Sequence, residues 1–255
     1  MNVLVCIKRV PATGGRIMLT PDEQEIDTRF LGFTVSPHEE CAVEEALRLV
    51  GNDGGSTTVL SLGSAASAEQ LQDALALGID RAVLLETDGR EWDPAATAAA
   101  IVEAVRAESA AGVEYDLLLF GNEAADTGDY QVGIRVAHAL GLPCVTGVKG
   151  LEIRDRTAVA RRESAGVVEI FEVSLPAVVT VKEGINLPRY PSIPGRIRAK
   201  RQPIERTEPG WPGNGLSKVR LELPAEKEKR AEMLGRGAEA APRVAEVLAE
   251  LGLLR

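Results

Sequence analysis

The amino-acid sequence predicts an α/β protein with a doubly wound, mainly parallel β-sheet, an antiparallel extension and a C-terminal arm. Before residue 142, short apolar runs alternate with amphipathic segments in units of about 30 residues. Apolar residues make up 45% of the chain and aromatic residues only 4%, so the core is aliphatic and rich in alanine. Near residue 144 the rhythm changes, and short alternating runs separated by turns replace the helices.

Four strands and four helices account for the first part of the chain. The strands are expected at 2–7, 56–63, 81–86 and 115–120, and the helices at 36–50, 67–78, 93–108 and 129–141. The first strand, NVLVCI, is apolar on both faces, as buried parallel strands are. Ser36 caps the first helix and Pro37 takes its first position, and Asp93 and Pro94 repeat this pattern. This alternation predicts a Rossmann-like sheet that binds ligands beyond the carboxyl ends of its strands.

The remaining segments are expected to be less regular. Residues 16–31 alternate weakly and suggest a hairpin on an edge. Antiparallel strands are expected at about 144–175, and 175–181 reads as one more strand of the sheet. A proline- and arginine-rich loop follows at about 185–200. We therefore expect a nucleotide-binding domain at 1–205 and an arm at 206–255.

The arm ends in an amphipathic helix. Its apolar face is formed by Val244, Val247, Leu248 and Leu251. A lone amphipathic helix on a Pro/Gly-rich tether needs a surface that covers its stripe. Either its own domain or another chain supplies that cover.

Composition and charge exclude several classes of function. The net charge is −9 and the pI is about 5.0, which argues against nucleic-acid binding. No stretch is long and apolar enough for membrane insertion. Cys6, Cys41 and Cys144 are scattered, which favours small buried side chains over a disulfide framework or a metal site. These features predict a soluble, cytoplasmic protein.

The residues of common catalytic sites are also missing. The histidines are His38, in a first helical turn, and His138, between two alanines. No serine stands in GxSxG, and no Cys/His cluster has metal-ligand spacing. Asp126 and Asp129 are interpreted as capping a turn and a helix rather than as an acid/base pair. We assign no catalytic residue.

The stretch GNEAADTGDYQVG at 121–133 joins a strand to a helix and is a candidate phosphate site. Gly121 and Gly128 let the backbone run close to a ligand. A helix from Tyr130 would direct the N–H groups of Gln131 and Val132 at an anion. Because the acids would repel a phosphate, Asp126 is better placed on ribose hydroxyls or on loop N–H groups. A plain structural turn remains the alternative.

Three stretches together resemble the β subunit of electron transfer flavoproteins. They are VLVCIKRVP at the N-terminus, GNEAADTGDYQVG with LGLP in the middle, and LPAVVTVKEGINLPRYPSIPGRIRAKRQPIE. The segment SPHEECAVEEALRL also fits, and the motifs run from residue 2 to about 205. The resemblance implies an electron-carrier subunit rather than an enzyme. It also implies a heterodimer with an α subunit, which the C-terminal arm wraps around.

The resemblance implies cofactors and partners as well. FAD, held mainly by the α subunit, would accept electrons from flavin-dependent dehydrogenases and pass them to an acceptor such as a quinone oxidoreductase. AMP would lie in this subunit, with a second, NADH-reactive FAD of bifurcating members as the alternative. By matching motif, the nucleotide contacts are Cys6, Ser36, Pro37, His38, Glu39, Leu62, Gly121, Asn122, Glu123, Ala124, Asp126, Thr127, Gly128, Asp129, Tyr130, Gln131 and Val132.

The same resemblance implies a partner-recognition loop and a domain restraint. The loop residues are Arg189, Tyr190, Pro191, Ser192, Ile193, Pro194, Gly195 and Arg196, with Ile193 as the apolar anchor. Glu163 stands where the family keeps an acid that restrains the flavin domain. The sequence departs from the family at Ser36 and His38, where Asn and an aromatic residue are usual, and at Leu187, where an acid is usual. A stand-alone adenine-nucleotide sensor of the universal-stress type would share the sheet but would not need NLPRYPSIPG or the tethered helix.

Overall fold

The computed structural model describes residues 1–12, 14, 17–224 and 232–254. The chain divides into two compact units, Met1–Val219 and Arg220–Arg255. The first unit therefore continues past residue 205, where the sequence suggested a boundary. Within the described residues, no helix is long and apolar enough to cross a membrane.

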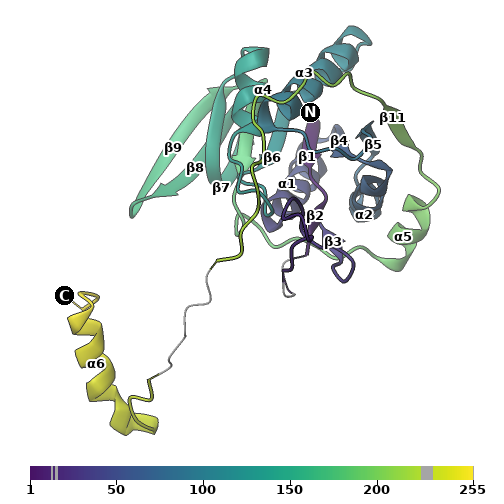
Figure 1. Ribbon diagram of the computed structural model, residues 1–255. Coiled ribbons are helices and arrows are strands. Elements are labelled where there is room, and N and C mark those ends of the chain that lie inside the picture. Colours follow the sequence, from purple (N-terminus) through teal and green to yellow (C-terminus); the bar gives the residue numbers. More distant parts are fainter. Residues whose placement is uncertain (13, 15–16, 225–231, 255) are drawn as a thin grey trace. The chain divides into compact units, whose positions relative to one another are not determined.

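A nine-stranded sheet organises the first unit (Figure 1). Its strands, in spatial order, are β11 (Ile204–Thr207), β5 (Arg81–Glu86), β4 (Ser56–Gly63), β1 (Asn2–Ile7), β6 (Leu117–Gly121), β10 (Ala177–Val181), β7 (Cys144–Arg154), β8 (Thr157–Ser164) and β9 (Val167–Ser174). The pairs from β11 to β7 are parallel, and β7, β8 and β9 pair antiparallel. The predicted fold class, including the antiparallel extension, is confirmed.

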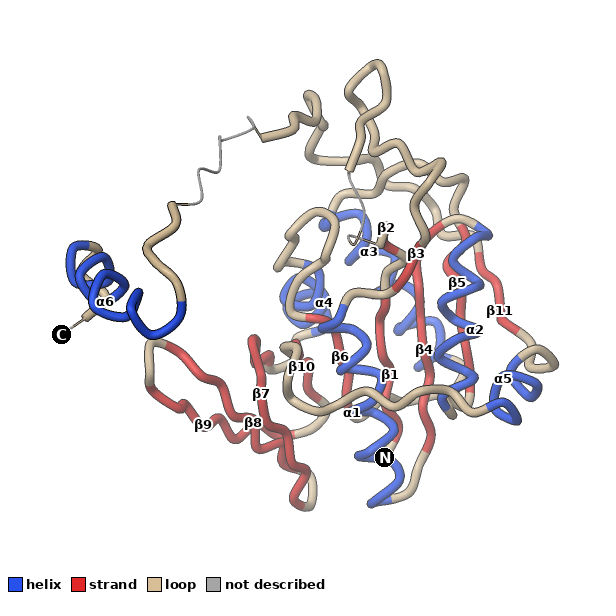
Figure 2. The backbone as a smooth tube through the Cα atoms, turned by 90° about the horizontal axis from the view of Figure 1, so that it is seen from below, coloured by secondary structure: helices blue, strands red, loops and turns tan. Residues whose placement is uncertain are grey.

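Helices cover both faces of the parallel strands (Figure 2). They are α1 (Pro37–Asp53), α2 (Ala68–Leu77), preceded by the short helix η1 (Ala65–Ser67), α3 (Pro94–Ala110) and α4 (Val132–Leu140). One buried cluster joins α1 and α2 to Val3, Val5 and Val59. The other joins α3 and α4 to Leu4 and Leu60. Because successive residues of a strand point to opposite faces, apolar strands of this kind serve two cores at once.

The winding of the sheet reverses between β1 and β6. From β1 the chain passes through α1 to β4 and through α2 to β5, then returns through α3 to β6 on the other side of β1. The loops after β1 and β6 therefore leave the same edge of the sheet in opposite directions. In open α/β sheets this is the place where ligands bind.

Two predicted segments differ from the structure here. The hairpin expected at 16–31 contains only an isolated bridge between Leu19 and Ile26, and residue 16 lies outside the described residues. Thr20 Oγ1 and Asp22 Oδ1 accept backbone N–H groups in this turn, which competes with strand pairing. The regular pairing nearby is between β2 (Val10–Pro11) and β3 (Phe33–Thr34), which form a separate sheet. The last helix of the series begins at Val132 rather than at about 130.

The segment 182–203, here called the belt, leads from the middle of the sheet to its edge. It leaves β10, crosses α1 and α2, contains the helix α5 (Ile193–Ala199) and ends at β11 (Figure 2). The sequence suggested a loop here, and it did not indicate β11. Helix α5 packs on α2 through Gly195, where a Cβ would lie 2.4 Å from the carbonyl oxygen of Ala76.

The second unit contains η2 (Gly237–Ala240) and α6 (Ala241–Glu250). No residue of α6 is buried. Val244 and Leu251, which belong to the predicted apolar stripe, are 39% and 66% exposed. The amphipathic helix exists as predicted, and the two middle residues of its stripe, Val247 and Leu248, are half-buried.

Candidate functional site

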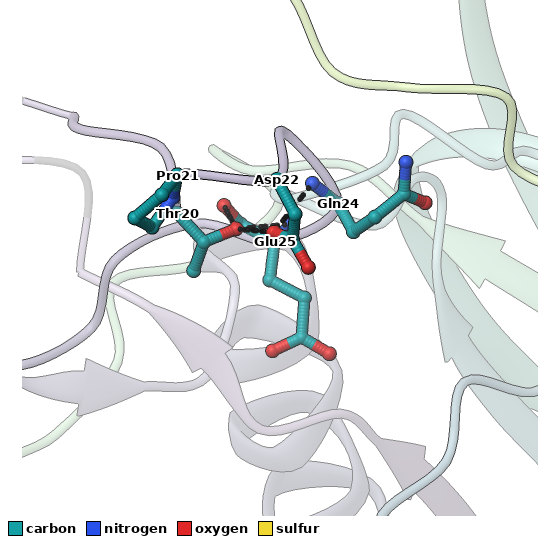
Figure 3. A pocket seen from close by; sticks show the side chains of 5 residues that line it. All are labelled: Thr20, Pro21, Asp22, Gln24 and Glu25. Atoms are coloured by element: carbon teal, nitrogen blue, oxygen red, sulfur yellow. Dashed lines mark hydrogen bonds between the residues drawn. The ribbon is translucent and has the colours of Figure 1, made fainter.

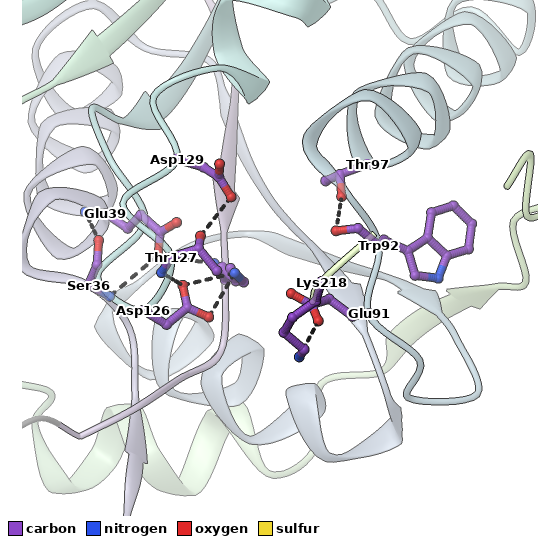
Figure 4. Close-up of polar contacts among 10 residues, drawn as sticks. Ser36, Glu39, Glu91, Trp92, Thr97, Asp126, Thr127, Asp129 and Lys218 are labelled. Atoms are coloured by element: carbon purple, nitrogen blue, oxygen red, sulfur yellow. Dashed lines mark hydrogen bonds and ion pairs between the residues drawn. The ribbon is translucent and has the colours of Figure 1, made fainter. Parts of the chain in front are cut away.

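The start of α1 and the loop after β6 meet at the carboxyl edge of the sheet, where the winding reverses. Figure 4 shows Ser36, Glu39, Asp126, Thr127 and Asp129 together on one side of this edge. The structure thus places next to each other two segments that the sequence analysis singled out separately. Their contacts define the geometry of the candidate site.

Glu39 ties the end of β1 to the start of α1. Its Oε2 accepts hydrogen bonds from the backbone N–H groups of Lys8 at 3.0 Å and Ser36 at 3.4 Å. The Glu39 N–H donates in return to Ser36 Oγ, which completes a capping box. Burial raises the pKa of Glu39 to about 8, although the two backbone donors act in the opposite direction. The buried Glu39 side chain therefore fixes the position of Lys8 and Ser36 relative to each other.

Gly121, the last residue of β6, leaves space for α1. A Cβ at this position would lie 2.6 Å from Glu39 Cγ and 3.3 Å from His38 Cβ. The sequence suggested that this glycine lets the backbone approach a ligand. In the structure the close approach is to the start of α1, so any side chain here would push the helix away from the sheet.

The loop between β6 and α4 is braced by its own side chains. Asp126 Oδ1 accepts the Thr127 N–H at 2.9 Å, and the Thr127 hydroxyl donates to Asp129 Oδ2 at 2.7 Å. The Gly128 N–H donates to the Ala124 carbonyl at 2.8 Å, and Gly128 has a positive φ of 66°. Asp126 thus braces the turn as predicted, whereas Asp129 does not cap the helix, because α4 begins at Val132 with Gln131 at the N-cap position.

Lys8 is a member of the site that sequence reasoning missed. Its Nζ lies 2.8 Å from Asp126, and its side chain remains 42% exposed. The available signal was a cation placed directly after a buried strand in the quoted stretch VLVCIKRVP. Lys8 supplies positive charge at an edge whose loop is otherwise acidic.

Helix α4 begins without a side-chain cap. Gln131 stands at the N-cap position but makes no capping bond, because its Oε1 accepts from Arg135 at 2.9 and 3.1 Å. Ser36 and Asp93, in contrast, cap α1 and α3 with their side chains. Within the described residues, the start of α4 at Val132 thus has no side-chain cap, and the positive end of the helix faces the loop.

Small and polar residues hold α4 and its loop on the sheet. A Cβ at Gly133 would lie 2.9 Å from Thr180 Cγ2 and 3.2 Å from Phe120 Cγ. The Thr180 hydroxyl donates to Asn122 Oδ1 at 3.0 Å and accepts the Gly147 N–H at 3.1 Å. The side-chain oxygen of Asn122 therefore has a structural partner.

Three other predicted contacts vary in their access to solvent. Cys6 is buried between its strand neighbours Leu60 and Phe120, and burial raises the pKa of its thiol. Leu62 packs against the core beneath α3 and α4. Tyr130 lies on the surface of the loop. Cys6 and Leu62 thus lie beneath the surface of the candidate site, whereas Tyr130 lies on it.

The start of α3 faces this group across the edge, where Figure 4 shows Trp92. Asp93 Oδ1 caps the helix through the Ala96 N–H at 2.7 Å. Its Oδ2 accepts the N–H groups of Gly215 at 2.7 Å and Leu216 at 3.1 Å. The buried Trp92 Nε1 has no hydrogen-bond partner within the described part of the chain. The sequence predicted Asp93 as a cap but not as the anchor of residues 214–216.

A hollow of about 340 Å³ lies elsewhere, in the turn between Leu19 and Ile26 (Figure 3). It is lined by Thr20, Pro21, Asp22, Gln24 and Glu25. The lining holds two carboxylates and no cation, which is unsuited to a phosphate. The nucleotide hypothesis therefore concerns the edge between β1 and β6.

Comparisons with known proteins identify the family of the chain. The family model described as "Electron transfer flavoprotein domain" matches residues 26–210. A protein of Bacillus subtilis named "Electron transfer flavoprotein subunit beta" is 36% identical over 82% of this chain and 79% of its own length. The chain belongs to the electron transfer flavoprotein family.

Further relatives include differently named members. The "Electron transfer flavoprotein subunit beta" of Syntrophomonas wolfei is 36% identical over 80% of this chain and 78% of its own length. The "Caffeyl-CoA reductase-Etf complex subunit CarD" of Acetobacterium woodii is 32% identical over 80% of this chain and 77% of its own length. The matched region of this electron transfer flavoprotein chain includes α1, the loop before α4 and the belt.

The belt of this electron transfer flavoprotein chain presents apolar side chains to solvent. Leu187, Tyr190 and Ile193 are 90%, 95% and 76% exposed. Ser192 Oγ accepts the Gly195 N–H at 3.1 Å and caps α5, so Ile193 is the first helical residue. Most of the predicted recognition residues therefore lie exposed on a short, capped helix and the segment before it, whereas Gly195 is buried against α2.

Glu163 lies at a distance from these residues in the fold, near the end of β8. Its Oε2 is 3.9 Å from Lys149 Nζ of β7, and its side chain is mainly exposed. This loose ion pair leaves the carboxylate accessible on the antiparallel extension. The restraint of a flavin domain by Glu163 stays a prediction.

Proposed function

We propose that this chain is the β subunit of a heterodimeric electron transfer flavoprotein. In this role it takes part in electron transfer from flavin-dependent dehydrogenases to a quinone-linked or other acceptor. FAD, bound mainly by the α subunit, supplies the redox chemistry, and this chain is an electron-carrier subunit without a catalytic residue of its own. Family membership and relatives named as β subunits support the proposal.

AMP is the ligand that we assign to this subunit, with a structural role. The observation that carries the assignment is the uncapped start of α4 beside the Lys8 ammonium, at the point where the sheet reverses its winding. Backbone N–H groups and a cation suit a phosphate. The loop acids are already bonded to Lys8, to Thr127 or within the loop, so they are restrained from occupying the phosphate position.

The exposed surface of the belt is assigned to dehydrogenase docking. Ile193 is the proposed anchor, and Tyr190 and Leu187 extend the apolar area. Arg196 and Arg198 of α5 favour a partner with an acidic rim. The α6 stripe is assigned to the α subunit, since no residue of α6 is buried.

The nucleotide content of the co-expressed heterodimer tests the assignment. After denaturation, one FAD and one AMP per heterodimer are expected. If two FAD molecules per heterodimer are found and NADH bleaches the flavin, the ligand of this subunit is a second FAD rather than AMP. The protein would then be an electron-bifurcating member. Lack of any heterodimer on gel filtration would contradict the proposal as a whole and favour a stand-alone nucleotide-binding protein.

A further inference from the structure

His38 connects two segments that are far apart in the sequence. The backbone N–H of Glu183 donates to His38 Nδ1 at 2.8 Å, and His38 Nε2 lies 3.1 Å from Glu123 Oε1. Because Nδ1 accepts a hydrogen bond, the proton of the neutral ring is on Nε2, which donates to the Glu123 carboxylate. Both nitrogens are therefore used, and a purely aromatic side chain at this position would lose both bonds.

The two hydrogen bonds of His38 join the loop before α4 and the belt, the two segments to which we assign functions. Glu123 belongs to the loop between β6 and α4, next to the proposed phosphate site. Glu183 is the second residue of the belt, which follows β10 and carries Ile193. His38 itself lies in the first turn of α1, directly before the buried Glu39. The ring thus lies between the nucleotide loop and the start of the docking segment.

Helix α1 also holds the next part of the belt. Asn186 Nδ2 donates to Glu45 Oε2 at 3.0 Å. Arg189 donates to Glu44 from Nε at 2.8 Å and from Nη2 at 2.7 Å. Counted from His38, these acceptors lie six and seven residues along the helix, about two turns on. The belt follows α1 from its first turn toward α5, so a change at its start is carried along a continuous set of contacts.

We propose that His38 is a positioning residue that couples nucleotide binding in the loop before α4 to the order of the belt. The inference rests on the proposed function of both segments. A phosphate at the start of α4 would reduce the motion of the loop and of Glu123. Because the His38 ring is bonded to both Glu123 and Glu183, the motion of Glu183 would be reduced as well. Coupling between two binding sites is reciprocal, so a docked dehydrogenase would also tighten nucleotide binding.

Asparagine and glutamine separate the two bonds. In His38→Asn the side-chain oxygen takes the place of Nδ1 and accepts from Glu183, but nothing reaches Glu123. In His38→Gln the amide nitrogen takes the place of Nε2 and donates to Glu123, but the bond to Glu183 is lost. His38→Phe removes both. Coupling needs both bonds, so all three variants should lose it.

Hydrogen exchange of the co-expressed heterodimer, with and without AMP, measures the coupling. In the wild type, AMP should slow exchange over residues 182–192 and tighten binding of a dehydrogenase by about fivefold or more. In each His38 variant both effects of AMP should disappear. In the absence of AMP, only His38→Asn should keep the amide of Glu183 as protected as in the wild type. A purely structural role would change the protection but not its response to AMP.

His138 provides a matched control, because it is the other histidine of the chain and lies exposed in the last turn of α4. His138→Asn and His138→Gln should keep the full response to AMP. A full response in His38→Phe would overturn the coupling. A wild type that binds AMP without any change in the belt would also overturn it and leave the proposed function intact. A heterodimer that binds no AMP would overturn both the AMP assignment and the coupling.

Discussion

Gly121 lies against Glu39 so closely that a Cβ on Gly121 would stand 2.6 Å from Glu39 Cγ. Gly121→Ala should therefore displace α1 from β6 and lower the free energy of unfolding by about 1–3 kcal/mol. Because the shift reaches the loop before α4, the AMP content of the purified protein should fall as well. Chemical denaturation and nucleotide analysis measure the two effects.

Gly51→Ala is the control for this prediction. Gly51 lies within α1, and nothing would come within 4 Å of its Cβ. Alanine in a helix interior is favoured over glycine by about 0.5–1 kcal/mol, so this variant should be as stable as the wild type or more so. Equal losses of stability in the two variants would show that contact with Glu39 is not the cause.

Glu39 should make the protein less stable as the pH rises. Its pKa in the folded chain is raised to about 8 from the ordinary value of 4.5. Between these values the folded state binds more protons than the unfolded state, so the free energy of unfolding falls with rising pH. This contribution is fully present below about pH 4.5 and is lost as the pH passes through about 8.

Glu39→Gln isolates that contribution, because an amide oxygen can accept the N–H groups of Lys8 and Ser36 without ionising. Urea unfolding should show a shallower decline in stability between about pH 5 and pH 8 for the variant than for the wild type. Parallel curves for the two proteins would mean that Glu39 does not titrate in this range.

Ile193→Ala should weaken dehydrogenase binding and leave the fold intact. Ile193 is 76% exposed at the first position of α5, so its truncation removes little from the core. A central apolar anchor contributes about 2 kcal/mol or more to binding, which corresponds to at least about a 30-fold rise in Kd. Surface plasmon resonance with a partner dehydrogenase measures this change, and thermal unfolding checks the fold.

Val113→Ala serves as the comparison for Ile193→Ala, since Val113 is also exposed but lies in the turn after α3. Its binding should equal that of the wild type. If both variants bind the dehydrogenase with unchanged affinity, Ile193 is not the anchor.

Truncation after Val219 should separate folding from assembly. The first compact unit ends at this residue, and its sheet and both cores lie within it. The shortened chain should therefore fold, while its pairing with the α subunit should weaken because the α6 stripe is gone. Circular dichroism and gel filtration of the co-expressed subunits measure the two properties, and undiminished pairing would refute the role of α6.

Much of the fold could be predicted because local signals agreed with it. Ser36 with Pro37 and Asp93 with Pro94 mark helix starts in both the sequence and the structure. The belt was harder. Its prolines suggested a loop, whereas Ser192 caps α5 and the close fit of Gly195 on α2 stabilises it. β11 is short and mainly exposed, so its hydrophobic pattern is weak and its pairing with β5 depends on tertiary contacts.

The candidate site was predictable as a set of segments but not as a set of contacts. Motifs pointed to the loop before α4 and to the start of α1, yet the partners of His38 and Asp126 lie in segments that follow the strands β1, β6 and β10. Lys8 and Glu183 each follow a strand, but several other charged residues of the chain do so too. Lys8 lies beside the loop after β6 because β1 and β6 are neighbours in the sheet. The order of the strands is not visible in the sequence, so Lys8 could not be identified as a site residue from it.

The belt is attached at both ends to strands of one sheet, β10 in the middle and β11 at the edge. The distance it must cover is therefore set by the strands between them and by the helices it crosses. An inserted or deleted residue between 182 and 203 would shift β11 out of register with β5 or pull α5 off α2. Exposed positions such as Leu187 and Tyr190 carry no such constraint. Such a surface can change its choice of partner by substitution within a segment of fixed length.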